Sequence, residues 1–287
     1  MSRQRGVALL SVLLVMSLAL LLTGGMLRNH RLVVKSTAQQ LHQVQLRQLG
    51  FSGERWALQR LRRPEMQASR SVNLAQAWAQ ATPPFEVEGG TLHIQVEDLA
   101  ARFNLSALLA GGQVEPLTQQ RWVRLLALLQ IRNPDLESLA TSHFGALTDL
   151  SQLRGWPGVD GEVMRRLQPM VALLPRNASL NINTASAQQL MTLDGVSETL
   201  ARALVQQRPA EGYRSVQAFV EDPLLSGLEL GSHGLGLGSR WFRITVDVAV
   251  GQSRLQLVSE VELDAKTRQV NVVQRRFLTS LTSESSS

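Results

Sequence analysis

The residue types that most often do chemistry in proteins are sparse in this sequence and poorly spaced for it. The 287 residues include no cysteine, which excludes disulfides, thiolate metal sites and a cysteine nucleophile. No two histidines have a spacing suited to a shared metal ion; they are His30, His42, His93, His143 and His233. The glycines from Gly231 to Gly238 lack the spacing of a phosphate-binding turn and lead into a strand-like run. The sequence therefore predicts no active site and no enzyme.

The N-terminal sequence contains one peptide bond whose position is typical of a proteolytic cleavage site. Met1–Gly6 is polar and contains two arginines, and an uncharged apolar run follows at once from Val7 to Leu27. A secretory signal would have a shorter apolar run that ends in a small-x-small cleavage site, and Thr23–Gly25 matches such a site poorly. The other cleavable arrangement places the cut before the apolar run, after a glycine. The sequence therefore favours cleavage between Gly6 and Val7.

The run from Val7 to Leu27 has the length and composition of a transmembrane helix. At about 1.5 Å per residue it gives about 31 Å of helix, enough to cross a hydrocarbon core of about 30 Å. A helix inside a soluble core has no need of such a uniformly apolar surface. Arg3 and Arg5 precede the span and favour a cytoplasmic N-terminus. Three basic residues between positions 28 and 35 follow the span and weaken that preference.

The net charge of +6 belongs to the N-terminal arm. Residues 1–70 contain eleven basic and two acidic residues, whereas the other 217 residues contain 18 basic and 21 acidic ones. A basic surface over the whole globular part, as DNA binding would require, is therefore not supported. A basic segment beside a membrane span explains the excess better.

The spacing of apolar residues predicts how the rest of the chain folds. A helical pattern continues from Leu41 to Leu61, weakened by Gly50 and Gly53, and Pro64 marks its end. The further predicted elements are a short helix at Val72–Ala79, a strand at Thr91–Glu97, helices at Leu117–Ile131 and Glu162–Leu174, and three strands from Arg240 to Leu278. One early and three late strands thus flank a helical insert. Residues 279–287 form a polar tail that we expect to be disordered.

Asn181–Val220 contains a motif that also occurs in DNA-binding proteins. Asn183–Ala185 caps a first helix, Gly195 lies in a tight connector, and Ser197–Gln207 forms a second helix. Such a helix-hairpin-helix can bind a DNA phosphate through backbone N–H groups at a helix N-terminus. The connector lacks the second glycine of the DNA-binding form, and neighbouring acids repel phosphate. A membrane-anchored DNA-binding protein is the alternative function, which salt-dependent retention on DNA would distinguish.

The N-terminal residues resemble the processing site of type IV pilin-like proteins. Arg5-Gly6-Val7-Ala8-Leu9-Leu10 is similar to the junction at which, in that superfamily, a prepilin peptidase cuts after glycine and methylates the new N-terminus. Most members have glutamate at the fifth mature position, where this chain has Ser11. The missing acid resembles one branch, the protein K family of minor pseudopilins in type II secretion systems. The resemblance implies cleavage between Gly6 and Val7, methylation of Val7, and Ser11 in place of the assembly glutamate.

Two internal segments strengthen the resemblance and imply a fold. Val96–Asp98 with Arg102–Leu105 resembles the family's exit from its sheet, and Leu180–Ala185 resembles the entry to the second half of its helical domain. The implied class is α+β, with a long N-terminal transmembrane helix and a pilin-like α/β domain with an antiparallel sheet. An inserted all-α domain with helix-hairpin-helix-like elements interrupts that domain. The implied boundaries are a leader at 1–6, the span at 7–27, the pilin-like domain at 28–98 and 240–278, the insert at 99–239 and a tail at 279–287.

The resemblance also raises the question of calcium, because relatives of protein K typically have an acidic loop that holds it. The equivalent place after Leu117–Ile131 has two acids, and two carboxylates supply few of the six to eight oxygens that calcium takes. We therefore expect no metal and no other cofactor, and no substantial rise in melting temperature with calcium. If calcium did bind, the first candidate ligands would be Asp98, Asp135, Glu137 and Asp160.

The function that the resemblance implies is structural. The protein would be a single-pass inner-membrane protein with a cytoplasmic N-terminus and a periplasmic head. It would cap the pseudopilus tip and help to start its assembly, for export of folded proteins across the outer membrane. The implied partners are the minor pseudopilins I and J, the major pseudopilin, the prepilin peptidase, and the secretin or an exported substrate. Nucleic acid is not among them.

Overall fold

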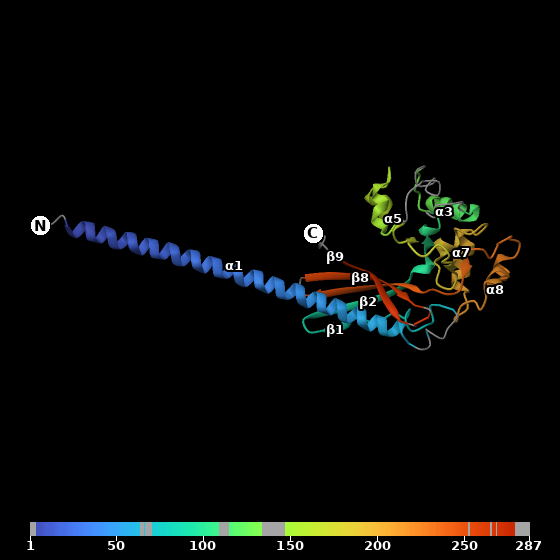
Figure 1. Cartoon of the computed structure of the whole chain (residues 1–287), viewed down its shortest axis with the longest axis horizontal. Coiled ribbons are helices and arrows are strands. Elements are labelled where there is room, and N and C mark those ends of the chain that lie inside the picture. Colours follow the sequence, from blue (N-terminus) through green and yellow to red (C-terminus); the bar gives the residue numbers. More distant parts are fainter. Residues whose placement is uncertain are drawn as a thin grey trace.

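The structure, a computed structural model, describes residues 4–63, 66, 71–108, 115–133, 147–251, 253–264, 266–267 and 269–278, with side chains from residue 12 onward. One long helix projects from a head that contains a sheet and a region of short helices (Figure 1). The sheet lies against the helix, and the short helices lie at the end of the head farther from the N-terminus.

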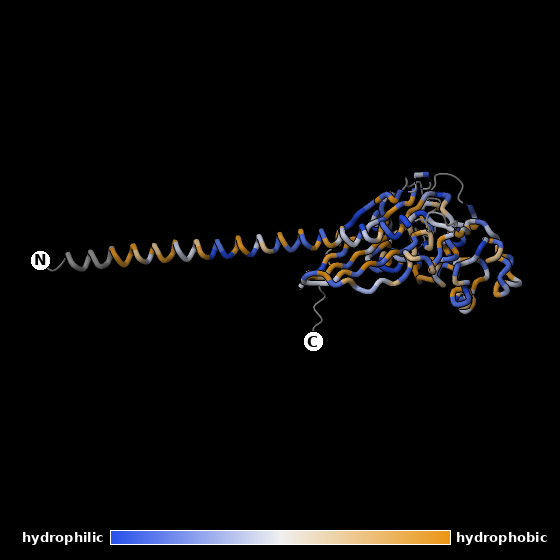
Figure 2. Tube along the Cα trace, turned by 90° about the horizontal axis from the view of Figure 1, so that it is seen from below, coloured by the Kyte–Doolittle hydropathy of each residue, from blue (hydrophilic) through white to orange (hydrophobic). Residues whose placement is uncertain are grey.

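Helix α1 (Gln4–Leu61) runs without interruption for 58 residues, which corresponds to about 87 Å. Residues 12–44 are exposed, and the outer part of this stretch is mostly apolar (Figure 2). Within the described part of the chain, α1 alone is long and apolar enough to span a membrane. The predicted span and the predicted continuation of the helix thus form one element, which Gly50 and Gly53 do not interrupt.

The head is built on an antiparallel sheet of five strands. The strands are β1 (Phe85–Val87), β2 (Gly90–Asp98), β7 (Trp241–Val250), β8 (Ser253–Leu263) and β9 (Val270–Leu278), in the spatial order β1-β2-β7-β8-β9. β2 pairs with β7 from Gly90 opposite Val250 to Asp98 opposite Phe242. The chain therefore leaves the sheet and returns to it at the same place. The four predicted strands are confirmed, and β1 adds a fifth that is too short to show an alternating pattern.

The last segment of α1, from Leu46 to Leu61, covers one face of this sheet. Alternate residues of β7 are buried against it, as the two-residue period of a strand requires. The helix approaches closely because it presents glycine: a Cβ atom added to Gly53 would lie 2.7 Å from Val246 Cγ1, and one added to Gly50 would lie 3.6 Å from Leu257 Cβ. The two glycines that weaken the helical pattern in the sequence are therefore packing positions.

The inserted region between β2 and β7 consists of short elements. The α-helices in its described residues are α3 (Pro116–Leu128), α5 (Gly161–Leu167), α6 (Ala187–Leu190), α7 (Glu198–Gln206) and α8 (Val216–Val220). Its 3-10 helices are η1 (Leu99–Ala101), η2 (Leu105–Ala107), η4 (Leu150–Gly155) and η5 (Pro223–Leu225). Two pairs of parallel strands are also present: β3 (Phe103–Asn104) with β4 (Val171–Ala172), and β5 (Leu180–Asn181) with β6 (Leu235–Gly236). Helices are therefore the main regular elements of the described insert, and the two short strand pairs are a detail that the sequence did not predict.

Two apolar cores divide the insert into two halves. The first surrounds the fully buried Trp122 of α3 and draws its buried residues from positions 103–171. The second surrounds the fully buried Phe219 of α8 and draws its buried residues from positions 182–235. Each half has too few residues for a large core, so contacts between the halves and with the sheet must add to its stability.

The helix predicted at Val72–Ala79 is wrong: this segment is a series of turns. The Oδ1 atom of Asn73 accepts a hydrogen bond from the Ala75 N–H at 3.0 Å. The Oε1 atom of Gln76 accepts from the Asn73 N–H at 3.1 Å and from Trp78 Nε1 at 2.9 Å. Side chains that bond to the nearby backbone in this way compete with the helical hydrogen-bond pattern.

The helix predicted at Glu162–Leu174 is too long, because α5 ends at Leu167. Pro169 follows two residues later, and because proline has no backbone N–H it cannot donate the next hydrogen bond of the helix. The chain then extends, and the Met170 carbonyl accepts a hydrogen bond from the Phe103 N–H at 3.0 Å. The last part of the predicted helix thus pairs as β4 with β3.

Candidate functional site

The residues predicted for processing and assembly all lie at the outer end of the projecting helix. Gly6, Val7 and Ser11 belong to α1, and their side chains lie outside the described part of the structure. The helical backbone connects them directly to the exposed apolar run that ends near Leu27. Their roles therefore stay predictions.

The first candidate functional surface is the projecting part of α1. Large apolar side chains are exposed from Val12 to Leu27, and five more lie beyond them: Leu32, Val33, Val34, Leu41 and Val44. Soluble monomers rarely expose a continuous apolar surface of this extent. A bilayer can cover the outer part of this surface, and the helices of other subunits can cover apolar residues that lie outside the bilayer.

The second candidate site is a buried hydrogen-bond network at the point where the chain leaves the sheet after β2. Asp98 Oδ2 accepts hydrogen bonds from Asn181 Nδ2 at 2.8 Å and from Thr184 Oγ1 at 2.6 Å. Its Oδ1 atom accepts one from the Ala100 N–H at 2.8 Å. Asn181 Nδ2 also donates to the Val72 carbonyl at 2.9 Å. This buried network ties together the end of β2, the second half of the insert and the segment that follows α1.

Burial raises the pKa of the Asp98 carboxyl group, and hydrogen bonds from Ser239, Thr184 and Asn181 partly oppose that rise. A buried carboxyl group costs free energy unless its oxygens have donors, and both oxygens have them here. Asp98 therefore acts as a structural acceptor that fixes the insert on the sheet. The sequence analysis singled out the segments around Asp98 and Asn181 separately. It did not predict that they are in contact, because residue spacing gives no information about pairs so far apart in the sequence.

A second asparagine continues this connection into the insert. Asn183 Oδ1 accepts a hydrogen bond from the Tyr213 N–H at 2.7 Å, and its Nδ2 donates to the Tyr213 carbonyl at 3.2 Å. Gly212 allows the close approach, because a Cβ atom there would lie 2.6 Å from Asn183 Cγ. The Tyr213 hydroxyl donates to Asp222 at 2.8 Å. The segment Leu180–Ala185 therefore has a structural role: its side chains connect the end of β2 with the second half of the insert.

Two of the four candidate calcium ligands, Asp98 and Asp160, lie in the described part of the structure. Asp98 is engaged in its network, and Asp160 caps α5 by accepting hydrogen bonds from two backbone N–H groups at 2.8 Å each. Asp135 and Glu137 lie outside the described residues. Among the residues that are described, no group of three His, Asp or Glu could hold a metal ion. The absence of calcium binding stays a prediction.

The predicted helix-hairpin-helix corresponds to α6, its connector and α7. Gly195 has a φ angle of 71°, and a Cβ atom there would lie 2.7 Å from Leu228 Cδ2, so the turn requires glycine. The cap of α6 is Ser186, whose hydroxyl accepts from the Gln189 N–H at 3.3 Å. The prediction that Asn183–Ala185 caps this helix is wrong, because Asn183 is engaged with Tyr213 instead.

The two arginines of this hairpin differ in their availability to a ligand. Arg208 donates to the carbonyls of Asn183 at 3.1 Å and Ala185 at 2.6 Å, so its guanidinium group is used inside the fold. Arg202 is exposed and forms a surface ion pair with Glu198 one helical turn away. The acid beside Arg202 offsets its charge, which disfavours phosphate binding at this surface.

A long helix with an exposed apolar N-terminal part, which packs its last segment on an antiparallel sheet, defines a class of protein, the membrane-anchored pilin-like proteins. A large insert distinguishes this chain within that class. The family model of type II secretion system protein K matches residues 180–237. Type II secretion system protein K of Pseudomonas aeruginosa is 30% identical over 296 residues, which cover 90% of this chain and 89% of that protein. The Klebsiella pneumoniae protein of the same name is 31% identical, over 96% of this chain and 97% of that protein. The chain belongs to the type II secretion system protein K family.

A solved structure supports the same assignment. The chain resembles a chain in the GspK-GspI-GspJ complex of the enterotoxigenic Escherichia coli type 2 secretion system, with a TM-score of 0.73 and 25% identity. The match covers 86% of this chain and all of that one. The predicted fold class and the predicted resemblance to protein K are thereby confirmed.

Proposed function

We propose that this chain is a minor pseudopilin that caps the tip of a type II secretion pseudopilus and helps to start its assembly. The role is structural and does not involve catalysis. The observation that supports it best is the position of the insert, which lies at the end of the head farther from the projecting helix (Figure 1). A head enlarged in this way is difficult to repeat along a closely stacked helical filament, whereas a single copy at an open end meets no copy of itself.

The proposed environment follows from the helix and the head. The apolar run would span the inner membrane with the N-terminus in the cytoplasm and the head in the periplasm. The partners would be the minor pseudopilins I and J, as in the related complex, with the major pseudopilin below them. They would pack laterally or from below against the exposed part of α1 and the sheet, and the insert would face the secretin or an exported substrate.

The tip position can be tested with labelled protein. Gold-labelled full-length chain, expressed in its host with the other pseudopilins, should mark one end of each pseudopilus in electron micrographs. Heads that lack residues 1–30, mixed with the heads of proteins I and J, should form a complex that contains one copy of this chain. Labels distributed along the filament, or self-polymerisation of the heads, would contradict the tip assignment.

The leader gives a second, independent test. Prepilin peptidase should cut between Gly6 and Val7 and methylate Val7, because the glycine lies where the polar leader meets the apolar helix. Mass spectrometry of the mature protein should show a methylated N-terminus at Val7. A Gly6→Val variant should keep the leader, since a bulky residue would obstruct a site that accepts glycine. A mature start at Met1, or beyond Thr23, would contradict the pilin-like processing.

A further inference from the structure

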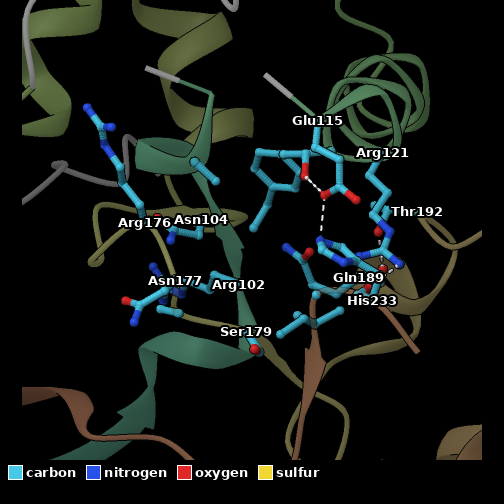
Figure 3. A pocket seen from close by; sticks show the side chains of 16 residues that line it. Arg102, Asn104, Glu115, Arg121, Arg176, Asn177, Ser179, Gln189, Thr192 and His233 are labelled. Carbon is cyan, nitrogen blue, oxygen red and sulfur yellow. Dashed lines mark hydrogen bonds and ion pairs between the residues drawn. The ribbon is translucent and has the colours of Figure 1, made fainter. Parts of the chain in front are cut away.

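A pocket of about 440 Å³ lies between the two halves of the insert. Its walls come from β3 and the N-terminal part of α3 in the first half, and from β5, α6 and the segment before β6 in the second (Figure 3). This volume is within the range of roughly 300–1,000 Å³ that is common for ligand sites. The proposed contacts with the membrane and with other pseudopilins involve α1 and the sheet. They give no role to the polar side chains that line this pocket.

The floor of the pocket contains a buried amide with an unused acceptor. Gln189 is 2% exposed, and its Nε2 atom donates to the Met170 carbonyl at 2.5 Å, which fixes the orientation of the amide. The Oε1 atom has no hydrogen-bond partner among the described residues. Figure 3 shows this side chain in the middle of the pocket-lining residues. A buried acceptor without a donor costs free energy, so a ligand that brings an N–H group would be favoured here.

The charge of the pocket is predominantly positive. Arg102, Arg121 and Arg176 line it, and Glu115 is the one acid among its described lining residues. Arg102 is paired with Glu97 at 2.8 Å, so Arg121 and Arg176 supply the excess positive charge. Glu115 already accepts from His233 Nε2 at 2.5 Å and from Thr118 Oγ1 at 3.3 Å.

Two of the arginines differ in how they are held. Arg121 is 7% exposed and donates through Nη2 to the His233 carbonyl at 3.0 Å, while its Nε atom has no partner among the described residues. Burial lowers the pKa of the Arg121 guanidinium group, which indicates a cation that an incoming anion would stabilise. Arg176 is exposed at the rim, where an anion can reach it.

We propose that this pocket binds a peptide segment with acidic side chains, with a backbone N–H of the peptide donating to Gln189 Oε1 and its carboxylates facing Arg176 and Arg121. A peptide supplies both groups that the pocket lacks, a neutral donor and an anion, one residue apart. An inorganic anion without an O–H group would leave Gln189 Oε1 without a donor. Its negative charge would also face the partial negative charge of that oxygen. A basic peptide would bring its cations against the guanidinium groups of Arg121 and Arg176.

Calorimetric titration of the full-length chain in detergent micelles tests this proposal. The probe is a blocked tetrapeptide with two central glutamates, compared with the matching glutamine and lysine peptides. We expect the glutamate peptide to bind about ten-fold more tightly than the glutamine peptide, and the lysine peptide to give no heat of binding. Equal affinity for the three peptides would overturn the proposal.

Two controls locate the site and its donor. Arg176→Ala should weaken the glutamate peptide about five-fold, whereas Arg154→Ala, which removes an exposed arginine outside the pocket, should leave affinity unchanged. A backbone N-methylated glutamate peptide cannot donate to Gln189 Oε1 and should lose about ten-fold or more. Unchanged binding of the methylated peptide, unchanged binding to Arg176→Ala, or equally tight binding of free glutamate would each refute the site. None of these results depends on where the subunit lies in the filament.

Discussion

Asp98 is the residue on which the attachment of the insert depends most directly. Its carboxyl group receives hydrogen bonds from the backbone of η1 and from the side chains of Asn181 and Thr184 in the second half of the insert. It also lies beside Ser239, where the chain is about to rejoin the sheet. Both connections between sheet and insert therefore meet at one buried carboxyl group.

Asp98→Asn should destabilise the protein in a pH-dependent way. The new amide group would face the Asn181 amide, which leaves a buried donor without an acceptor and costs about 1–3 kcal/mol. Burial raises the pKa of Asp98 in the folded state, so the native carboxyl group binds its proton more tightly than the unfolded one does. The stability of the wild-type protein should therefore fall as the pH rises from about 4 through the raised folded pKa.

The variant lacks this titration, so the difference in the free energy of unfolding between wild type and Asp98→Asn should shrink as the pH rises. Urea denaturation followed by tryptophan fluorescence at several pH values measures it. A difference that grows with pH would mean that the pKa of Asp98 is lowered instead.

Glu54 and Arg275 form an asymmetric ion pair between α1 and β9. Arg275 donates to the carboxylate through Nε at 2.8 Å and Nη2 at 2.9 Å, and Ser259 donates to it as well. The Glu54 side chain is 3% exposed, but that of Arg275 is 44% exposed. Removal of Arg275 therefore leaves a buried carboxylate, whereas removal of the Glu54 charge leaves a partly hydrated guanidinium.

Arg275→Ala should consequently cost about 3 kcal/mol, and Glu54→Gln only about 1 kcal/mol, because the glutamine oxygen can still accept hydrogen bonds. The double variant should be more stable than Arg275→Ala alone, since no buried charge remains. Denaturant unfolding of the three variants forms a double-mutant cycle. Equal costs for the two single variants would contradict the asymmetry.

At the scale of elements, the packing of α1 on the sheet depends on the lack of a side chain at one helical position. Gly53 and Gly50 are both buried against the sheet, less than one turn apart. A methyl group at Gly53 would lie 2.7 Å from Val246 and 3.2 Å from Leu92, whereas one at Gly50 would make ordinary contacts with Leu257 at 3.6 Å.

The two alanine variants should therefore behave in opposite ways. Gly50→Ala should be neutral or stabilise the protein by up to about 1 kcal/mol, through higher helix propensity. Gly53→Ala gains the same propensity but forces the helix from the sheet, and overpacking of this kind costs about 1–3 kcal/mol. Thermal melts of the two variants provide a matched comparison. If Gly53→Ala also raised the melting temperature, the close approach of α1 to Val246 would be wrong.

At the scale of the whole molecule, the described part of the projecting helix is coupled to the head through the last segment of α1, from Leu46 to Leu61. Residues 12–44 are exposed throughout, and the buried α1 residues of the sheet core begin at Leu46. The exposed stretch therefore serves contacts with lipid and other subunits and contributes little to the stability of the head.

Deletion of residues 1–30 should accordingly leave the free energy of unfolding of the head within about 0.5 kcal/mol of the full-length value. The same deletion should abolish association with lipid vesicles, because the apolar span is removed. Urea unfolding and vesicle flotation measure the two effects. A large loss of stability would show that the outer part of the helix folds back on the head.

The elements with long or strongly apolar patterns could be predicted from the amino-acid sequence. The run from Val7 to Leu27, the strands that became β2, β7, β8 and β9, and the helix that became α3 each repeat one period over enough residues to be recognised. The leader junction at Gly6 and Val7 is equally a local signal, and its role stays a prediction.

Other features depend on partners that are far away in the sequence. The turns at Val72–Ala79 are held by the Val72 N–H, which donates to the Leu237 carbonyl at 2.7 Å, and by Asn73 Nδ2, which donates to the Glu211 carbonyl at 2.9 Å. Strand β4 forms because Phe103 supplies a hydrogen-bond partner. The Asp98 network joins residues more than 80 positions apart, and the pocket around Gln189 exists only because the two halves of the insert meet. Local periodicity carries no information about such contacts, since they depend on how folded elements pack.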